Sequence, residues 1–489
     1  MRNSIIKEFN FLKQIDDKSI FKNSKVDHLK DIIISPICKY NYEDFPIDNY
    51  FESQNILHYV VEFKKTRSIL ILELNGYNEI LLNQLNDFLD EKILNVIIDY
   101  LSDIFLCEII YPNKKLSNSH KSTLILTAGP SISHREKIYV NDALIKGWNN
   151  EWSKYLNKFQ NSFAEYIGVK FSIATSSCTG AMQLALMALD IGQGDEGIVP
   201  DVTWVSTANV VHAVGATPIF ADVDIDTWTI DPKSIESKIT DKTKAIMPVH
   251  MYGHPADMDA IINLTTKYNL KIIEDAAPSI GALYKGKKTG SFGDFSAFSF
   301  QGAKLLVTGE GGMLCTNDES LYKKAYRLWD QGRIPGTFWI EEHGPKYKMS
   351  NIQAALGLGQ LERIDLMIEK KRQINNWYKS RLNQIDEIIF WDESKDVKSI
   401  CWMTSIRLTK KIKLNREQFC LKLKERNIDS RPVFPSISQY PYWRKKQDSQ
   451  NNSKIISNTG INLPSGVCLS KAEVDYICDS IIDIIKNDK

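Results

Sequence analysis

Cysteine is scarce in this chain, and no two cysteines lie close together in the sequence. The eight cysteines are scattered singly between Cys38 and Cys478, and no CxxC pair occurs. This spacing indicates neither a disulfide framework nor a zinc site, and we expect no metal. A chain with only unpaired thiols fits a reducing compartment, so we expect the protein in the cytoplasm.

Long apolar runs and an excess of charge of one sign are also missing. No segment reaches the roughly 18 uninterrupted apolar residues that indicate a membrane span. The N-terminus is interrupted by Lys7, Glu8 and Asn10, so it lacks the apolar core of a signal peptide. The 61 basic and 60 acidic residues give a formal net charge of +1 without a basic stretch, which argues against nucleic acid and membrane surfaces as partners. We expect a soluble protein that binds a small molecule.

The N-terminal quarter of the chain differs from the rest. It is rich in Asn, Asp, Lys and Ile, with strand-like runs at 58–63 and 68–74 and a helical pattern from about 78 to 105. A polar stretch at 113–122 is typical of a linker. We predict a separate α/β or α+β module over residues 1–120. Its sequence favours no function, and an oligomerisation piece, a degenerate catalytic domain and a docking module stay open.

Further along, short apolar runs alternate with helical patterns such as 180–189 and 258–268. This alternation predicts an α/β fold with a mostly parallel sheet covered by helices. We expect a large domain at 121–366 and a smaller α+β domain at 367–489. The apolar runs that we interpret as strands span 171–174, 197–200, 217–222, 245–249, 271–274 and 296–300.

Lys304 is the residue with the clearest chemical meaning. It lies five residues after Ser299, thirty after the acidic pair Glu274-Asp275, and just before a glycine-rich segment at 309–312. A lysine near a buried aspartate and a phosphate-binding hydroxyl is what pyridoxal phosphate (PLP) chemistry requires. The lysine forms the Schiff base, and the aspartate keeps the ring nitrogen of the cofactor protonated. A lysine on its own is usually a surface residue, so this prediction depends on the residues around it.

Several other strand ends carry residues that suit a phosphorylated aromatic ring. The strand at 171–174 runs through small residues into an apolar helix, where free N–H groups and the Thr179 hydroxyl can face a phosphate. Trp204 follows the strand at 197–200, where its indole can stack on a planar ring. Each feature has a plainer interpretation: a capped helix for Thr179 and for Asp275, and a core position for Trp204. Their ordered occurrence at successive strand ends favours the cofactor site.

From about residue 126 to 485 the chain resembles the DegT/StrS family of sugar-nucleotide aminotransferases, which are PLP enzymes of fold type I. Within that family, 431–434 and 461–465 are similar to members that aminate C4 of GDP-4-keto-6-deoxymannose to a perosamine-type sugar. The matching motifs lie at 192–196, 248–253, 274–277, 290–294, 298–304, 309–312 and 349–355.

The resemblance implies a role for each candidate residue. Lys304 is then the Schiff-base lysine and general acid/base, and Asp275 is the partner of the ring nitrogen. His250 and Arg431 are candidate substrate contacts. The other implied cofactor ligands are Trp204 on the ring and the Cys178 backbone, Thr179 and Ser299 at the phosphate.

The resemblance also implies a homodimer, or a larger assembly, with shared active sites. The segment at 344–349 corresponds to a loop that reaches the phosphate of the neighbouring subunit, and Lys346 stands where many members have asparagine. Two further positions depart from the family pattern. Pro278 replaces a glutamine or glutamate near the ring hydroxyl, and Ser438 replaces a histidine that follows the Arg-Pro segment.

The activity implied is transfer of the amino group of L-glutamate to a nucleotide-linked 4-keto-6-deoxysugar, for surface polysaccharide such as O-antigen. Lysine matters here because related PLP sugar dehydratases carry histidine at the position of Lys304. One alternative is an aminotransferase of the same fold for another ketosugar, 3-keto or linked to UDP or dTDP, or for a cyclitol ketone. Another is a non-catalytic regulator or scaffold that retains the PLP fold.

Overall fold

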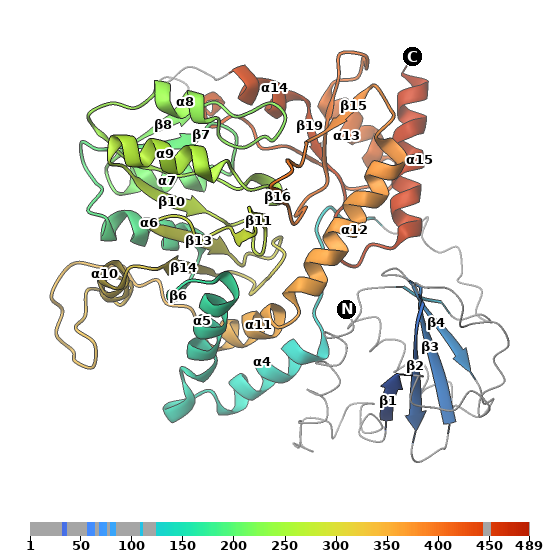
Figure 1. Ribbon diagram of the computed structural model, residues 1–489, viewed down its shortest axis with the longest axis horizontal. Coiled ribbons are helices and arrows are strands. Elements are labelled where there is room, and N and C mark those ends of the chain that lie inside the picture. Colours follow the sequence, from blue (N-terminus) through green and yellow to red (C-terminus); the bar gives the residue numbers. More distant parts are fainter. Residues whose placement is uncertain are drawn as a thin grey trace.

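A computed structural model gives the fold, and Figure 1 presents it as a ribbon. The residues that it describes are 32–36, 56–63, 68–75, 79–84, 108–110, 124–443 and 451–488. The predicted linker at 113–122 lies outside them. Among the helices that are described, none combines the length and the apolar character needed to cross a membrane.

The N-terminal strands form a sheet of their own in the order β1-β2-β3-β4-β5. Neighbours are antiparallel up to β4, and β5 pairs with β4 in parallel. The strands predicted at 58–63 and 68–74 are confirmed. The strands span Ile32–Pro36, Ile56–Phe63, Ser68–Asn75, Glu79–Gln84 and Glu108–Ile110.

The helix predicted from about 78 to 105 is wrong at its start, because β4 occupies Glu79–Gln84. The run Ile80-Leu81-Leu82 is too short for periodicity to separate a helix from a strand, and pairing on both sides with β3 and β5 makes it a strand. The rest of that predicted helix lies outside the described residues.

The large α/β part contains a sheet of seven strands in the order β6-β14-β13-β10-β9-β7-β8. All are parallel except β14, which is antiparallel to both of its neighbours. The predicted fold class, an α/β protein with a mostly parallel sheet, is confirmed. The strands are β6 (Phe171–Thr175), β7 (Glu196–Pro200), β8 (Thr217–Ala221), β9 (Thr243–Ile246), β10 (Lys271–Asp275), β13 (Phe295–Ser299) and β14 (Gly312–Thr316).

Helices pack on both faces of this sheet, as Figure 1 shows for α6 and α9. Aromatic side chains fill the space under α5, where Phe163 meets Phe298 of β13 edge to face with ring centroids 4.9 Å apart. Such pairs add to the stability gained by burying the rings. The helices are α4 (His134–Lys146), α5 (Lys154–Ile167), α6 (Cys178–Ala188), α7 (Ser206–Ala213), α8 (Pro232–Ser237), α9 (Met258–Tyr268), α10 (Glu319–Trp329) and α11 (Asn351–Leu361).

Two details of the sheet differ from the sequence prediction. The strand expected at 245–249 ends at Ile246, since beyond it Val249 forms only an isolated bridge with Asp275. The strand β14 was not predicted, because it begins inside a glycine-rich segment whose apolar run is short. It nevertheless lies between β6 and β13 and joins them into one sheet.

The C-terminal part has a second hydrophobic core around a four-stranded antiparallel sheet in the order β15-β17-β19-β18. Helix α12 (Ile364–Leu382) belongs to both cores: Ile364 and Met367 lie in the first, while Ile374 and Leu382 lie in the second. The domain boundary predicted at 366/367 therefore falls within a helix, and that division stays a prediction. The other elements are β15 (Ile388–Phe390), β17 (Ser405–Leu408), β18 (Arg431–Pro432), β19 (Gly460–Asn462), α13 (Arg416–Lys424), α14 (Asn451–Thr459) and α15 (Lys471–Asn487).

Three short strands form a separate small sheet in the order β12-β11-β16. Strand β11 pairs with both of the others in antiparallel fashion. The strands are β11 (Leu283–Tyr284), β12 (Lys287–Lys288) and β16 (Val397–Lys398). This sheet links the chain after β10 to the segment that leads into the second core.

Candidate active site

A cavity of about 520 Å³ lies where the parallel strands β6, β7, β10 and β13 end. Ligand sites of open α/β sheets occur at this edge. Three of the predicted site residues, Lys346, His250 and Arg431, are not among its lining residues. The structure brings the other six together around it: Cys178, Thr179, Trp204, Asp275, Ser299 and Lys304.

One end of the cavity is the start of α6. The Ser177 side chain caps this helix by accepting a hydrogen bond from Gly180 N at 3.0 Å. The N–H groups of Cys178 and Thr179 belong to the first turn, which has no acceptors within the helix and carries the positive end of its dipole. This end of the cavity can therefore bind a phosphate, with the Ser299 hydroxyl at the end of β13 lining the same space.

Gly312 allows β14 to approach this helix start closely. A Cβ at this position would lie 2.5 Å from Cys178 N and 2.8 Å from Phe298 O. Both are backbone atoms, which cannot move aside as the tip of a side chain can. The glycine is therefore needed to bring the start of α6 against the sheet.

Asp275 is the last residue of β10, and it is buried. Its Oδ2 accepts a hydrogen bond from Thr207 Oγ1 at 2.6 Å, and its Oδ1 accepts one from Ala277 N at 3.2 Å. A buried carboxylate is stable only with hydrogen bonds and a nearby positive charge. The protonated ring nitrogen of PLP would supply that charge, so the carboxylate fits the predicted cofactor.

Lys304 lies in the loop after β13, and its backbone N donates to Gln301 O at 2.8 Å. Its Nζ is 4.1 Å from the ring centroid of Trp402, a residue of the first core in the segment between β16 and β17. Burial lowers the pKa of Lys304 below its usual value, and the nearby Asp275 and Cys178 act in the opposite direction. Burial, followed by the charge of Asp275, raises the pKa of the Cys178 thiol well above its usual range. Lys304 is thus the nucleophilic group that the site favours, since its neutral amine is the reactive form.

Trp204 lies in the segment between β7 and α7. Its side chain is 57% exposed, so it is not a core residue. The indole lies against Phe434, with ring centroids 5.7 Å apart and an angle of 56° between the rings. An indole that lines a cavity and is held from one side can stack on a planar ligand.

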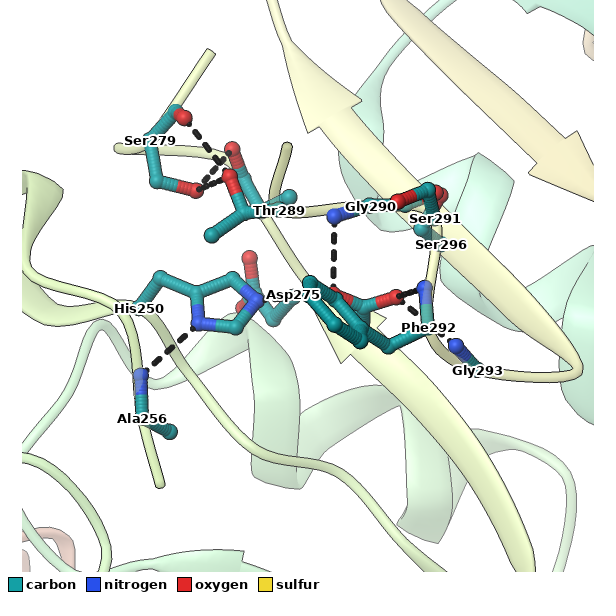
Figure 2. A network of polar contacts seen from close by, with 12 residues as sticks. His250, Ala256, Asp275, Ser279, Thr289, Gly290, Ser291, Phe292, Gly293 and Ser296 are labelled. Atoms are coloured by element: carbon teal, nitrogen blue, oxygen red, sulfur yellow. Dashed lines mark hydrogen bonds and ion pairs between the residues drawn. The ribbon is translucent and has the colours of Figure 1, made fainter. Parts of the chain in front are cut away.

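His250 is part of a buried polar network instead of the cavity (Figure 2). Its Nδ1 accepts a hydrogen bond from Ala256 N at 3.1 Å, so its Nε2 carries the proton and donates to Glu274 Oε2 at 3.0 Å. The Glu274 carboxylate also accepts bonds from the backbone N–H groups of Gly290, Phe292 and Gly293. Both ring nitrogens are thus engaged, and the arrangement gives the predicted substrate contact of His250 no support.

The two other predicted residues outside the cavity are both exposed. Arg431 is in β18, and its Nε lies 3.3 Å from Asp429 Oδ2. Lys346 is next to Tyr347, whose carbonyl accepts a hydrogen bond from Ser176 N at 2.7 Å, just before the start of α6. The segment of Lys346 therefore passes close to the phosphate end of the cavity without placing the lysine in it.

The two departures from the family pattern have clear positions. Ser438 is buried, and its N and Oγ both donate to the carboxylate of Asp201 at 2.8 Å. This contact ties the segment of Ser438, whose neighbour Ile437 lies in the first core, to the segment that carries Trp204. Pro278 is buried three residues after Asp275 and has no side-chain donor.

Sequence reasoning missed three residues of the site. Trp402 and Phe434 come from segments that follow α12 and line the cavity, and no local pattern indicates that they reach it. Thr207 holds Asp275 and lies one helical turn after Trp204, so a hydroxyl at the start of the helix after β7 was a usable signal. Its partner on another strand could not be read from the sequence.

Comparisons with known proteins agree with this geometry. Residues 130–482 match the DegT/DnrJ/EryC1/StrS aminotransferase family. GDP-perosamine synthase of Escherichia coli O157:H7 is 44% identical over 353 residues, which cover 72% of this chain and 96% of the relative. GDP-perosamine synthase of Caulobacter vibrioides is 38% identical over 364 residues, 74% of this chain and 98% of the relative.

Solved structures have the same fold. The putative sugar aminotransferase Spr1654 from Streptococcus pneumoniae, in its PLP form, superposes with a TM-score of 0.70 at 26% identity, covering 75% of this chain and all of that one. The fold and the site thus define a PLP-dependent aminotransferase of fold type I, as predicted. The chain belongs to the DegT/DnrJ/EryC1/StrS aminotransferase family.

Proposed function

We propose that the protein transfers the amino group of L-glutamate to C4 of a GDP-linked 4-keto-6-deoxysugar, as a step in making surface polysaccharide such as O-antigen. The substrate class rests on the similarity to GDP-perosamine synthases at 38% and 44% identity. The observation that carries the proposal is that Lys304 and Asp275 line one cavity. A lysine at position 304 favours amination over the dehydration that related enzymes with histidine there perform.

The predicted residues that line the cavity have distinct parts in this reaction. PLP, when bound, supplies an aromatic ring that accepts the electrons released as a proton leaves the amino-bearing carbon. Lys304 takes that proton from the substrate carbon and returns one later, and its lowered pKa favours the neutral amine that can accept the proton. Asp275 holds a proton on the ring nitrogen. The first turn of α6 and Ser299 bind the phosphate, and Trp204 fixes the plane of the ring.

The active form in this proposal is a homodimer with shared sites. Phe338 and Trp339 are 95% and 70% exposed at the tip of the loop between α10 and α11. Exposed apolar residues side by side are typical of a contact surface. Lys346 lies further along the same loop, and we propose that it donates to the phosphate bound by the other subunit. The cysteines are scattered singly and indicate no disulfide framework, which supports the cytoplasm as the location.

The direct test is a substrate screen with Lys304→Ala as the negative control. GDP-, dTDP- and UDP-linked 4-keto-6-deoxysugars are each incubated with L-glutamate, and 2-oxoglutarate is measured. We expect turnover with the GDP-linked sugar and a loss of at least about 10²-fold in Lys304→Ala, since an acid–base group contributes that much or more. Full activity of Lys304→Ala would refute the site, and turnover only with UDP- or dTDP-linked sugars would refute the proposed substrate.

A further inference from the structure

Lys371 is a lysine buried between the two cores, in the middle of α12. Its side chain belongs to the helix that joins the two cores, and the residue is 5% exposed. Its Nζ donates to Trp402 O at 2.9 Å and also to Ser465 O. A lysine that is fully buried is rare unless its amine is paired, and here its partners are two backbone carbonyls.

Trp402 connects Lys371 to Lys304, the lysine that takes part in the reaction. Its indole Nε1 donates to Ala303 O at 3.0 Å, directly before Lys304. The Nζ of Lys304 lies over the same indole, 4.1 Å from its centroid. The backbone of Trp402 is therefore held by Lys371, while its side chain holds the loop and the amine of Lys304.

Other contacts also join the loop of Trp402 to its surroundings, and Lys371 adds a cross-link from this loop to the segment of Ser465. Trp402 N donates to Tyr252 O at 3.0 Å, which fixes the tryptophan to the first core. Ser465 Oγ accepts from Thr404 N at 2.9 Å, so the two loops also meet without the lysine. The amine adds the bond that joins the carbonyl of Trp402 to the carbonyl of Ser465 and to α12.

We propose that Lys371 is a positioning residue of the transamination site, which sets the indole of Trp402 beneath the amine of Lys304. This inference rests on the proposed function of Lys304. Burial lowers the pKa of Lys371 to about 7, and its two hydrogen bonds to carbonyls can form near this pH. A neutral amine still has two N–H donors, which is enough for the two carbonyls, so both hydrogen bonds are kept in either protonation state.

The test compares Lys371→Met with Lys379→Met. Lys379 is on the same helix and also donates to a tryptophan carbonyl, Trp391 O at 3.4 Å, but that tryptophan does not line the cavity. We expect kcat/KM to fall about 10- to 100-fold in Lys371→Met, as for a displaced catalytic group, and to change by less than about twofold in Lys379→Met. Lys371→Arg keeps N–H donors and should restore most of the rate.

A second readout needs neither cofactor nor substrate. The reactivity of Lys304 toward reductive methylation is followed against pH in the cofactor-free protein, by mass spectrometry of its peptide. Releasing Trp402 lets water reach the amine, so the midpoint should rise in Lys371→Met and in Trp402→Phe, with little further rise in the double variant. Equal midpoints in folded Lys371→Met and Lys379→Met would overturn the proposal.

If Lys371→Met fails to fold, Trp402→Phe tests the proposal instead. An unchanged methylation midpoint of Lys304 in Trp402→Phe also overturns the proposal. Thermal unfolding establishes which variants are folded. Failure of the proposed function is a separate result: it appears as an active Lys304→Ala enzyme, whereas the methylation midpoints still report on Lys371.

Discussion

Thr207 Oγ1 donates to Asp275 Oδ2 across 2.6 Å, and so connects the start of α7 to the end of β10. The bond fixes the carboxylate that faces the cavity. Hydrogen bonds to charged groups contribute about 1.5 to 3 kcal/mol. The orientation of Asp275 is thus provided by a residue from the strand-to-helix segment after β7, the one that also carries Trp204.

We predict that Thr207→Val weakens PLP binding and lowers kcat/KM about tenfold, because valine keeps the shape of threonine but not its donor. The measurement is a PLP titration together with steady-state kinetics. Thr265→Val is the matched control, since Thr265 donates to Ile262 O within α9, away from the cavity. Equal PLP affinity in the two variants would show that Asp275 does not depend on this bond.

The pH dependence of Lys304 is the second prediction. Burial lowers its pKa, so in the cofactor-free protein its methylation midpoint should lie below that of a free lysine, about 10.4. Asp275 acts in the opposite direction, since its negative charge favours the ammonium form. Asp275→Asn should therefore lower the midpoint further, and Asp259→Asn, which removes an exposed carboxylate paired with Lys285, should leave it unchanged. A rise in Asp275→Asn would contradict the assigned contact.

Gly312→Ala tests the close packing between β14 and α6. The added Cβ would meet Cys178 N at 2.5 Å, and overpacking of this kind costs about 1 to 3 kcal/mol of stability. We expect a lower midpoint of chemical unfolding and weaker PLP binding, because the phosphate end of the cavity must shift. Gly129→Ala is the control, since its nearest contact would be at 3.9 Å. If both variants bind PLP alike, β14 does not set the position of the helix.

The exposed loop tip is predicted to lie in the dimer contact. Changing Phe338 and Trp339 together to aspartate should reduce the mass in solution from two chains to one and lower the activity, since two charges oppose burial. Light scattering after size-exclusion chromatography measures the mass. Leu421→Asp is the control, an exposed apolar residue of α13 at 58% exposure. A dimer that survives the double change would place the contact elsewhere.

Much of the site could be predicted from the sequence because it lies at strand ends. Lys304, Asp275 and Trp204 each follow an apolar run, and parallel strands end at one edge of a sheet, so their proximity follows from topology. Trp402 could not be found in this way. It lies almost a hundred residues after Lys304, in the segment between β16 and β17, and its approach is set by tertiary packing.

His250 and β4 are two cases in which the prediction from the sequence was not supported by the structure. A histidine in a family motif suggests a ligand contact, but its two nitrogens are used by Ala256 and Glu274, which only the folded chain reveals. The run at 79–84 was ambiguous between helix and strand, and its partners on β3 and β5 decided between them. In both cases the missing information was the identity of a partner distant in sequence.

Helix α12 has a consequence for engineering this enzyme. Its first half is buried in one core and its second half in the other, with Lys371 at the changeover. In a chimera joined at 366/367, the two parts of this helix would come from different parent proteins. Each part would have to pack correctly in its own core while remaining one continuous helix. Chimeras that exchange sugar specificity between relatives should therefore have their joints outside this helix. Each chimera then receives the whole of α12 from a single parent.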